Sequence, residues 1–393
     1  MADEYVETRV DTGVVLVRTD SVALLDEIDA ILFDCDGVLI DVRESYTKTI
    51  HASVAYIMQE LFDVDFPATQ SLLELIHTFK KSGGFNNEWD IVYSILLHLF
   101  NKLPKKLQRK LIATRHQLAD KPLSERFLLA KKTFQRQLQP QEHSSLLDLG
   151  PAFALARKAN STGISSIERE FKNASDSKEV FEATQQFLTY PGRVGESLLT
   201  TIFEEIFCGS ILFEKQYGIK PRFYLDSGLI TKEKRIVSPK ILDDLASLIG
   251  QNNFGIATGR PYSLTKHTLG SLLDSFNRKA SVFIEDVLEA QRNERVTMGE
   301  IDLTKPNPFS LLKSSEGLNP FKRVAYVGDS SEDIIMVKKA CELDNRFLSV
   351  GVYSTSSFRE DLISNFIELE TDVILPSIKE LAGLIKNYGM MKR

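Results

Sequence analysis

The sequence predicts an α/β fold, in which a Rossmann-like parallel sheet forms the core and an all-helical cap domain is inserted after strand one. The first observation is an apolar run, Ile31-Leu32-Phe33, which is typical of a buried strand. The second is helical periodicity, which dominates from about residue 44 to residue 217. The third is the alternation of strand and helix patterns after about residue 238, as in a parallel sheet covered by helices on both faces.

These patterns divide the 393-residue chain into three parts. Residues 1–27 form an N-terminal extension, 28–42 plus 236–393 form the core, and 43–235 form the helical cap. The hinges between core and cap are expected at Asp41-Val42-Arg43 and near Asp226-Ser227-Gly228.

The elements follow in order along the chain. Residues 5–18 alternate around Asp11-Thr12-Gly13, which predicts a β-hairpin. In the cap, helical spacing predicts helices over about 44–61 and 69–80, and a third helix with Asn87 as its N-cap. In the second half, apolar runs predict strands around 254–257, 282–284, 323–328 and 347–352, and helical spacing predicts helices over 241–248, 263–273 and 378–385.

Composition excludes several classes of protein. With 43% hydrophobic and 26% charged residues the chain resembles an ordinary soluble globular protein, and a net charge of −6 argues against a surface that coats nucleic acid. The three cysteines are widely spaced, and the six histidines lack the spacing of metal ligands, so we interpret the histidines as structural. No stretch approaches the roughly 20 apolar residues that cross a bilayer, and the acidic first residues do not resemble a signal peptide. A cytoplasmic protein with no membrane partner is expected.

Polar residues stand where the predicted strands end. Asp34 and Asp36 follow the first strand and, two apart on an extended chain, point to the same side, while Gly37 lets the backbone turn away. Asp-x-Asp-Gly alone is equally consistent with an acidic turn. Thr258-Gly259 follows a second strand, and Asp329 follows a third, with Asp333 one helical turn beyond it. Because carboxyl ends of parallel strands share one edge of a sheet, these groups are expected to meet there.

With Lys305 in the loop Lys305-Pro306-Asn307-Pro308, these pieces resemble, in this order, the signature of the haloacid dehalogenase (HAD) superfamily of phosphohydrolases. The resemblance implies a Mg²⁺-dependent phosphomonoester hydrolase that acts through an aspartyl-phosphate. It makes Asp34 the nucleophile and Asp36 the general acid and base. The implied phosphate-binding residues are Thr258, Gly259 and Lys305. Thr258 and Lys305 are also implied to be catalytic. The implied metal site comprises Asp34, the main-chain carbonyl of Asp36, Asp329 and Asp333, the last holding a metal-bound water.

The stretch Gly83-Gly84-Phe85-Asn86-Asn87-Glu88-Trp89-Asp90 contains the only tryptophan of the chain. A turn followed by an N-cap would explain part of it. It also resembles the GGFNNxWD element of a subfamily I-like branch of the superfamily with a large helical C1-type cap. That resemblance implies a substrate-contacting role for Gly84, Phe85, Asn86, Asn87 and Trp89. Arg260, next to the threonine motif, either contacts substrate or pairs with a carboxylate.

Residues 102–136 carry eleven basic side chains against Asp120 and Glu125: Lys102, Lys105, Lys106, Arg109, Lys110, Arg115, Lys121, Arg126, Lys131, Lys132 and Arg136. Such a run is typical of a solvated helix face, and it could also attract a nucleic-acid end. The predicted function is a phosphatase for a small phosphorylated metabolite. The alternatives are a nucleic-acid end phosphatase, a non-catalytic HAD-like binding or regulatory protein, and a mutase or phosphonate-cleaving variant. The sequence does not specify the physiological substrate or the oligomeric state.

Overall fold

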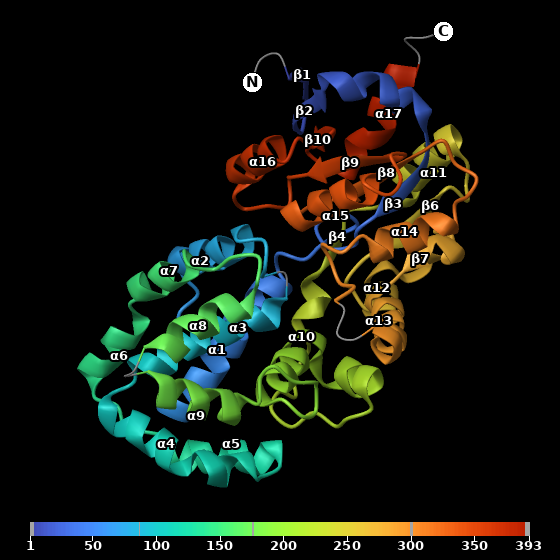
Figure 1. Ribbon diagram of the computed structural model, residues 1–393. Helices are drawn as coiled ribbons and strands as arrows, with labels where there is room; N and C mark the ends of the chain where they lie inside the picture. Colours follow the sequence, from blue (N-terminus) through green and yellow to red (C-terminus); the bar gives the residue numbers. More distant parts are fainter. Residues whose placement is uncertain (1–3, 86, 175–176, 299–301, 390–393) are drawn as a thin grey trace. The chain divides into compact units, whose positions relative to one another are not determined.

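The computed structural model describes residues 4–85, 87–174, 177–298 and 302–389. The chain divides into two compact units, which are described separately (Figure 1). Unit 1 comprises Met1–Arg43 and Glu233–Arg393, and unit 2 comprises Glu44–Lys232.

Unit 1 is built on an eight-stranded sheet in the order β1-β2-β10-β9-β8-β3-β6-β7 (Figure 1). The strands are β1 (Tyr5–Val10), β2 (Gly13–Arg18), β3 (Ile28–Phe33), β6 (Phe254–Ala257), β7 (Ser281–Val282), β8 (Arg323–Gly328), β9 (Phe347–Val352) and β10 (Val373–Leu375). From β10 to β7 each neighbouring pair is parallel. The α/β fold class predicted from the sequence is confirmed.

The N-terminal residues are part of this sheet. β1 and β2 form an antiparallel hairpin around Asp11-Thr12, and β2 pairs antiparallel with β10 through Val17 opposite Val373. The hairpin therefore extends the core sheet at the edge where the last strand of the chain lies.

The side chains of β3 alternate between the two faces of the sheet, because successive residues of a strand point to opposite sides. Ile31 and Phe33 belong to one hydrophobic cluster, which includes residues of α11 and α17. Ala30 and Leu32 belong to a second cluster, with residues of α14 and α15. Both faces of β3 are thus covered, which explains why its sequence is continuously apolar.

The helices of unit 1 connect the strands and cover both faces of the sheet. The 3₁₀ helices are η1 (Thr19–Glu27), η3 (Gly270–Ser275), η4 (Arg278–Ala280) and η5 (Ile378–Glu380). The α-helices are α11 (Pro239–Ile249), α12 (Tyr262–Leu269), α13 (Ile284–Met298), α14 (Phe309–Glu316), α15 (Ser331–Cys341), α16 (Arg359–Glu368) and α17 (Leu381–Gly389).

Two short strands mark the ends of the insertion. β4 (Ile40–Asp41) pairs antiparallel with β5 (Lys234–Arg235), so the chain leaves and re-enters unit 1 through adjacent segments. The return was expected near Asp226-Ser227-Gly228, but these residues lie inside unit 2. A Cβ on Gly228 would lie 2.1 Å from the carbonyl carbon of Cys208, so glycine is required there by packing against α10 rather than by a hinge.

Unit 2 consists of helices. They are α1 (Tyr46–Phe62), α2 (Gln70–Lys81), α3 (Glu88–Lys102), α4 (Lys105–Ala119), α5 (Leu123–Phe134), α6 (Pro140–Leu147), α7 (Gly150–Ala156), α8 (Ile164–Asn173), α9 (Lys178–Leu188), α10 (Leu198–Tyr217) and η2 (Leu229–Lys232). Asn87 caps α3 as predicted, since its side chain accepts a hydrogen bond from the Trp89 amide. The described residues of the two units include no helix with the length and apolar character of a membrane-spanning segment.

Much of the basic stretch of residues 102–136 is used inside unit 2. Four of its cations form ion pairs with carboxylates, namely Lys102 with Asp148, Arg115 with Glu182, Lys121 with Glu125 and Lys131 with Glu60. Arg126 is buried, and its guanidinium donates to the carbonyls of Ala119, Lys121 and Phe187. Fewer positive charges are therefore available to a binding partner than the count of basic residues indicates.

A buried carboxylate joins α3 to α10. Glu204 accepts hydrogen bonds from Trp89 Nε1 at 3.0 Å and from the Tyr217 hydroxyl at 2.8 Å, with Cys208 Sγ at 3.7 Å. Burial raises the pKa of Glu204 to about 7, although these three hydrogen bonds lower it. The ordinary pKa of glutamate is 4.5, so between about pH 4.5 and pH 7 Glu204 keeps its proton in the folded state but loses it in the unfolded chain. The free energy of unfolding therefore falls as pH rises through this range.

Replacing Glu204 by glutamine keeps the shape and removes the buried charge. We expect Glu204→Gln to raise the free energy of unfolding of unit 2 at pH 8, by at most about 3 kcal/mol, and to change it little at pH 4.5. Trp89 is the only tryptophan, so its fluorescence during urea unfolding reports on this unit. Glu214→Gln, on the exposed face of α10, is the control and should have no such pH-dependent effect. An equal change in the free energy of unfolding at both pH values would contradict the raised pKa of Glu204.

Candidate active site

The registers of the central strands bring the predicted site residues to one edge of the sheet. Phe33 of β3 lies opposite Val327 of β8 and Ile256 of β6, so the three strands end at the same level. The Asp34 amide continues the ladder by donating to the Val327 carbonyl. Asp34, Thr258 and Asp329 therefore follow adjacent strands at their carboxyl ends, as the sequence predicted.

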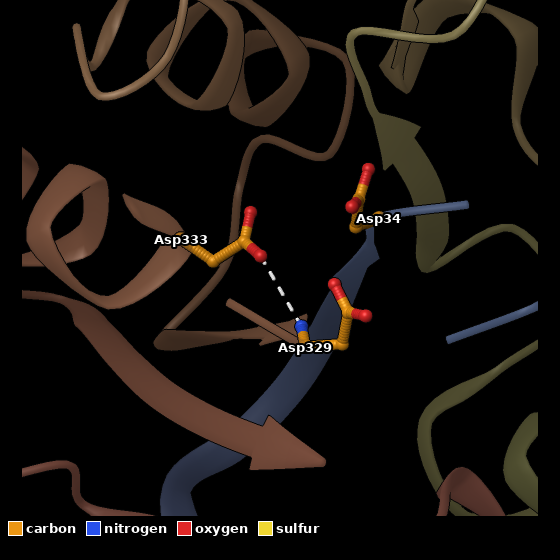
Figure 2. Close-up of side chains that lie close together, drawn as sticks. All are labelled: Asp34, Asp329 and Asp333. Carbon is orange, nitrogen blue, oxygen red and sulfur yellow. Dashed lines mark hydrogen bonds between the residues drawn. The ribbon is translucent and has the colours of Figure 1, made fainter. Parts of the chain in front are cut away.

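Three carboxylates meet at this edge. Asp34, Asp329 and Asp333 each offer an oxygen, and these oxygens lie within 4.8 Å of one another. Figure 2 shows Asp34 at the end of β3, Asp329 after β8 and Asp333 on α15, with the Asp329 amide joined to the Asp333 carboxylate. Segments separated by about 300 residues thus supply one cluster of negative charge.

Gly37 is required by this cluster. It has a φ of +72°, and a Cβ built there would lie 1.8 Å from Asp329 Oδ2. Any other residue would therefore push the Asp329 carboxylate away from the loop that follows Asp36.

Lys305 lies between two of the carboxylates. Its Nζ is 3.0 Å from Asp34 Oδ1 and 2.7 Å from Asp333 Oδ1. Burial alone would lower the pKa of Lys305, but the charges of Asp333 and Asp34 raise it well above its ordinary value. The ammonium is therefore a permanent positive charge beside Asp34.

Asp34 is buried among these charges. Burial raises its pKa to about 6, while Lys305 acts in the opposite direction, as does a hydrogen bond from the Thr258 hydroxyl. The neighbouring carboxylates Asp333 and Asp36 raise it further. A cation added to the cluster would favour the ionised form, which is the form that can act as a nucleophile.

Donors surround both oxygens of the Asp333 carboxylate. Oδ1 lies within hydrogen-bonding distance of Lys305 Nζ and of the Tyr326 hydroxyl at 3.1 Å. Oδ2 accepts from the amides of Asp329 and Ser330 and from Ser330 Oγ at 2.7 Å. A metal ion would have to displace one of these donors to bind Asp333 directly. The residue is better suited to orienting Lys305 and the loop that carries Asp329.

The donor set fits a hard divalent cation. Mg²⁺ prefers carboxylate and carbonyl oxygens, and Lys305 offsets one of the three clustered negative charges. The carboxylates of Asp34 and Asp329 are the side chains best placed to hold such an ion. The Asp36 carbonyl remains a predicted ligand.

The threonine motif lies at the same edge. Thr258 is buried, and its hydroxyl accepts a hydrogen bond from the Arg260 amide at 3.2 Å. A Cβ built on Gly259 would meet no atom within 4 Å, so there is open space beside its backbone. A phosphate oxygen could approach there, and the predicted phosphate-binding role of these residues stays a prediction.

Asp36 forms an ion pair with Arg260. Arg260 Nη1 donates to Asp36 Oδ1 at 2.7 Å, and Nη2 donates to Glu233 Oε2 at 2.6 Å. The side chains of Arg260 and Glu233 are 0% exposed, whereas that of Asp36 is 30% exposed. Arg260 was expected either to contact substrate or to pair with a carboxylate. In the structure it pairs with two carboxylates, Asp36 and Glu233.

The predicted substrate-contacting residues of the cap have structural partners within unit 2. Phe85 is buried against Phe79, and Trp89 donates to Glu204. A Cβ on Gly84 would lie 2.4 Å from the Asn160 carbonyl oxygen, so close packing requires this glycine. Asn87 caps α3, and Asn86 lies outside the described residues. A role for this element in substrate recognition stays a prediction.

Sequence reasoning missed three contributors to the site. Ser330 and Asp333 form a capping box at the start of α15, a pattern that Ser-x-x-Asp could have indicated. Tyr326 is the polar side chain within the buried run of residues 324–328, and this was the available signal for it. Glu233 belongs to no motif, and no sequence signal identifies it as the partner of Arg260.

Comparisons with known proteins identify a family for this chain and solved structures that are similar to it. The family model of haloacid dehalogenase-like hydrolases matches residues 28–340. An X-ray structure of a Northeast Structural Genomics Consortium target is similar over 92% of this chain and 99% of that chain, with 22% identity and a TM-score of 0.61. Phosphatase Tt82 from Thermococcus thioreducens matches over 86% of this chain and 98% of that chain, with 20% identity and a TM-score of 0.45. No curated protein matches. The match to the family model covers most of the chain, and the chain therefore belongs to the haloacid dehalogenase-like hydrolase family.

Proposed function

We propose that this hydrolase cleaves phosphate monoesters through an aspartyl-phosphate formed on Asp34. The observation that carries the proposal is the surroundings of Asp34. Its carboxylate stands at the end of the central strand β3, 3.0 Å from Lys305 Nζ, with oxygens of Asp329 and Asp333 within 4.8 Å. A carboxylate can attack an anionic phosphoryl group only where positive charge offsets the repulsion.

The reaction would proceed in two displacements. In the first, an Asp34 oxygen attacks phosphorus, the bond from phosphorus to the ester oxygen breaks, and Asp36 donates a proton to the departing alcohol. In the second, Asp36 takes a proton from water, the water oxygen attacks phosphorus, and inorganic phosphate leaves with Asp34 regenerated. Lys305 would offset negative charge on the phosphoryl oxygens in both steps. Mg²⁺, held by Asp34 and Asp329, would supply further positive charge to these oxygens when bound.

Asp36 favours phosphoryl chemistry over displacement at carbon. A halide leaves as a stable anion and needs no proton, whereas an alkoxide is a poor leaving group unless it is protonated. A carboxyl group 30% exposed at the same strand end as Asp34 is suited to that task.

The proposed substrate is a small phosphorylated metabolite. Four cations of the basic stretch are paired with carboxylates and Arg126 is buried, so the structure offers no specific support for the nucleic-acid alternative among the described residues. The three cysteines are free thiols, in keeping with the proposed cytoplasmic location.

Asp34→Asn removes the nucleophile and keeps the shape of the side chain. We expect it to reduce phosphate release from aryl phosphates by at least about a thousandfold, because amide nitrogen and oxygen do not form the acyl-phosphate. Asp29→Asn, at the amino end of the same strand, is the control and should leave turnover unchanged. Retention of most activity by the Asp34 variant would overturn the nucleophile assignment.

Removal of the divalent ion should stop turnover. We expect excess chelator to abolish phosphate release and added Mg²⁺ to restore it. Asp329→Asn should raise the Mg²⁺ concentration needed for half-maximal rate by about tenfold or more, since one charged ligand is lost. Asp274→Asn, an exposed carboxylate of η3, should not shift that concentration. Full activity in chelator would exclude the proposed role of the metal.

A further inference from the structure

We propose that Arg260 is a positioning residue that holds the general acid Asp36 in one orientation, and that Glu233 is built in to anchor Arg260. The inference rests on the proposed function, because it assigns a role to Asp36 in that reaction. Neither Arg260 nor Glu233 would touch the phosphoryl group in this role; both act through Asp36.

The contact to Asp36 selects one of its two oxygens. Arg260 Nη1 donates to Oδ1 at 2.7 Å. A guanidinium has donors only, so Oδ1 must accept, and the proton that Asp36 delivers has to be on Oδ2. The ion pair therefore fixes both the orientation of the carboxyl group and the atom from which the proton departs.

The anchor of Arg260 is a buried ion pair. Nη2 donates to Glu233 Oε2 at 2.6 Å, and Thr268 Oγ1 donates to the same oxygen at 2.5 Å. The side chains of Arg260 and Glu233 are both 0% exposed. These contacts join three segments: the loop between β6 and α12, the end of α12, and the residue just before β5.

Glu233 solves an electrostatic problem that the proposed reaction creates. During turnover Asp36 alternates between a neutral acid and a carboxylate. If Asp36 were its sole partner, the buried guanidinium would lose its counter-charge whenever Asp36 became neutral, which is costly in a protein interior. Glu233 remains paired with Arg260 in both states, so the arginine can keep its position throughout the cycle.

The consequence is specific to the leaving group. Positioning of the acid matters most when the departing oxygen needs a proton, and least when it leaves readily as an anion. A residue that only stabilises the fold would affect all substrates alike.

The experiment measures kcat/KM of the full-length protein with phenyl phosphate and with p-nitrophenyl phosphate, whose leaving group departs readily as an anion. Arg260→Lys keeps the charge and loses the two-pronged geometry. We expect it to lose about tenfold or more with phenyl phosphate and less than about threefold with p-nitrophenyl phosphate. Asp36→Asn should show the same pattern more strongly, and the double variant should be no slower than Asp36→Asn alone.

Two further variants keep the test decisive. Glu233→Gln loosens the anchor without touching Asp36 and should show the same leaving-group dependence to a smaller extent, even if Arg260→Lys fails to fold. Arg346→Lys is the matched control, because Arg346 pairs with Asp344 at the amino end of β9 and should affect neither substrate.

Each outcome bears on a distinct claim. An equal loss with both substrates, no loss with either, or an additive double variant would overturn the positioning role. Failure of the wild type to hydrolyse either ester, or full activity in Asp34→Asn, would instead overturn the proposed function, and the inference with it.

Discussion

The site depends on holding three carboxylates together against their mutual repulsion. Lys305 does this by direct contact, since its ammonium lies against both Asp34 and Asp333. The backbone contributes as well, because amides at the start of α15 donate to Asp333. Without these donors, burial and repulsion would favour protonation of Asp34, which would then be a poor nucleophile. Lys305 and the amides thus favour the ionised form of Asp34, which the proposed reaction requires.

The sequence was most informative where chemistry and strand ends coincide. Asp34, Thr258 and Asp329 could be placed at one edge because parallel strands end together, whereas Lys305 was implied only by the family resemblance; the structure has all four in one unit. Glu233 could not be found, because its role arises from the packing of segments that share no pattern. The return to the core was expected near Gly228 but lies at Glu233 and β5, and Gly228 is instead required by close packing against α10.

The cap element illustrates how a motif can carry structural as well as functional meaning. Within unit 2, Trp89 donates a hydrogen bond to the buried Glu204, and Asn87 caps α3. Both residues therefore have a structural role. A sequence pattern cannot separate residues that shape a loop from residues that touch a ligand, because both roles constrain the same short stretch. In the core the distinction was possible, since carboxylates clustered at a strand end are unfavourable unless something binds them.

The order of strands in the sheet has a consequence for synthesis of the chain. β3 lies between β6 and β8, and β2 pairs with β10, so the N-terminal strands bond to partners made much later. Residues 44–232, by contrast, form one compact unit that is contiguous in the sequence. On the ribosome the helical insert can fold before β6 and β8, the neighbours of β3 in the sheet, have been synthesised. Asp34, the proposed nucleophile, is therefore translated well before Thr258, Lys305 and Asp329, which complete its surroundings.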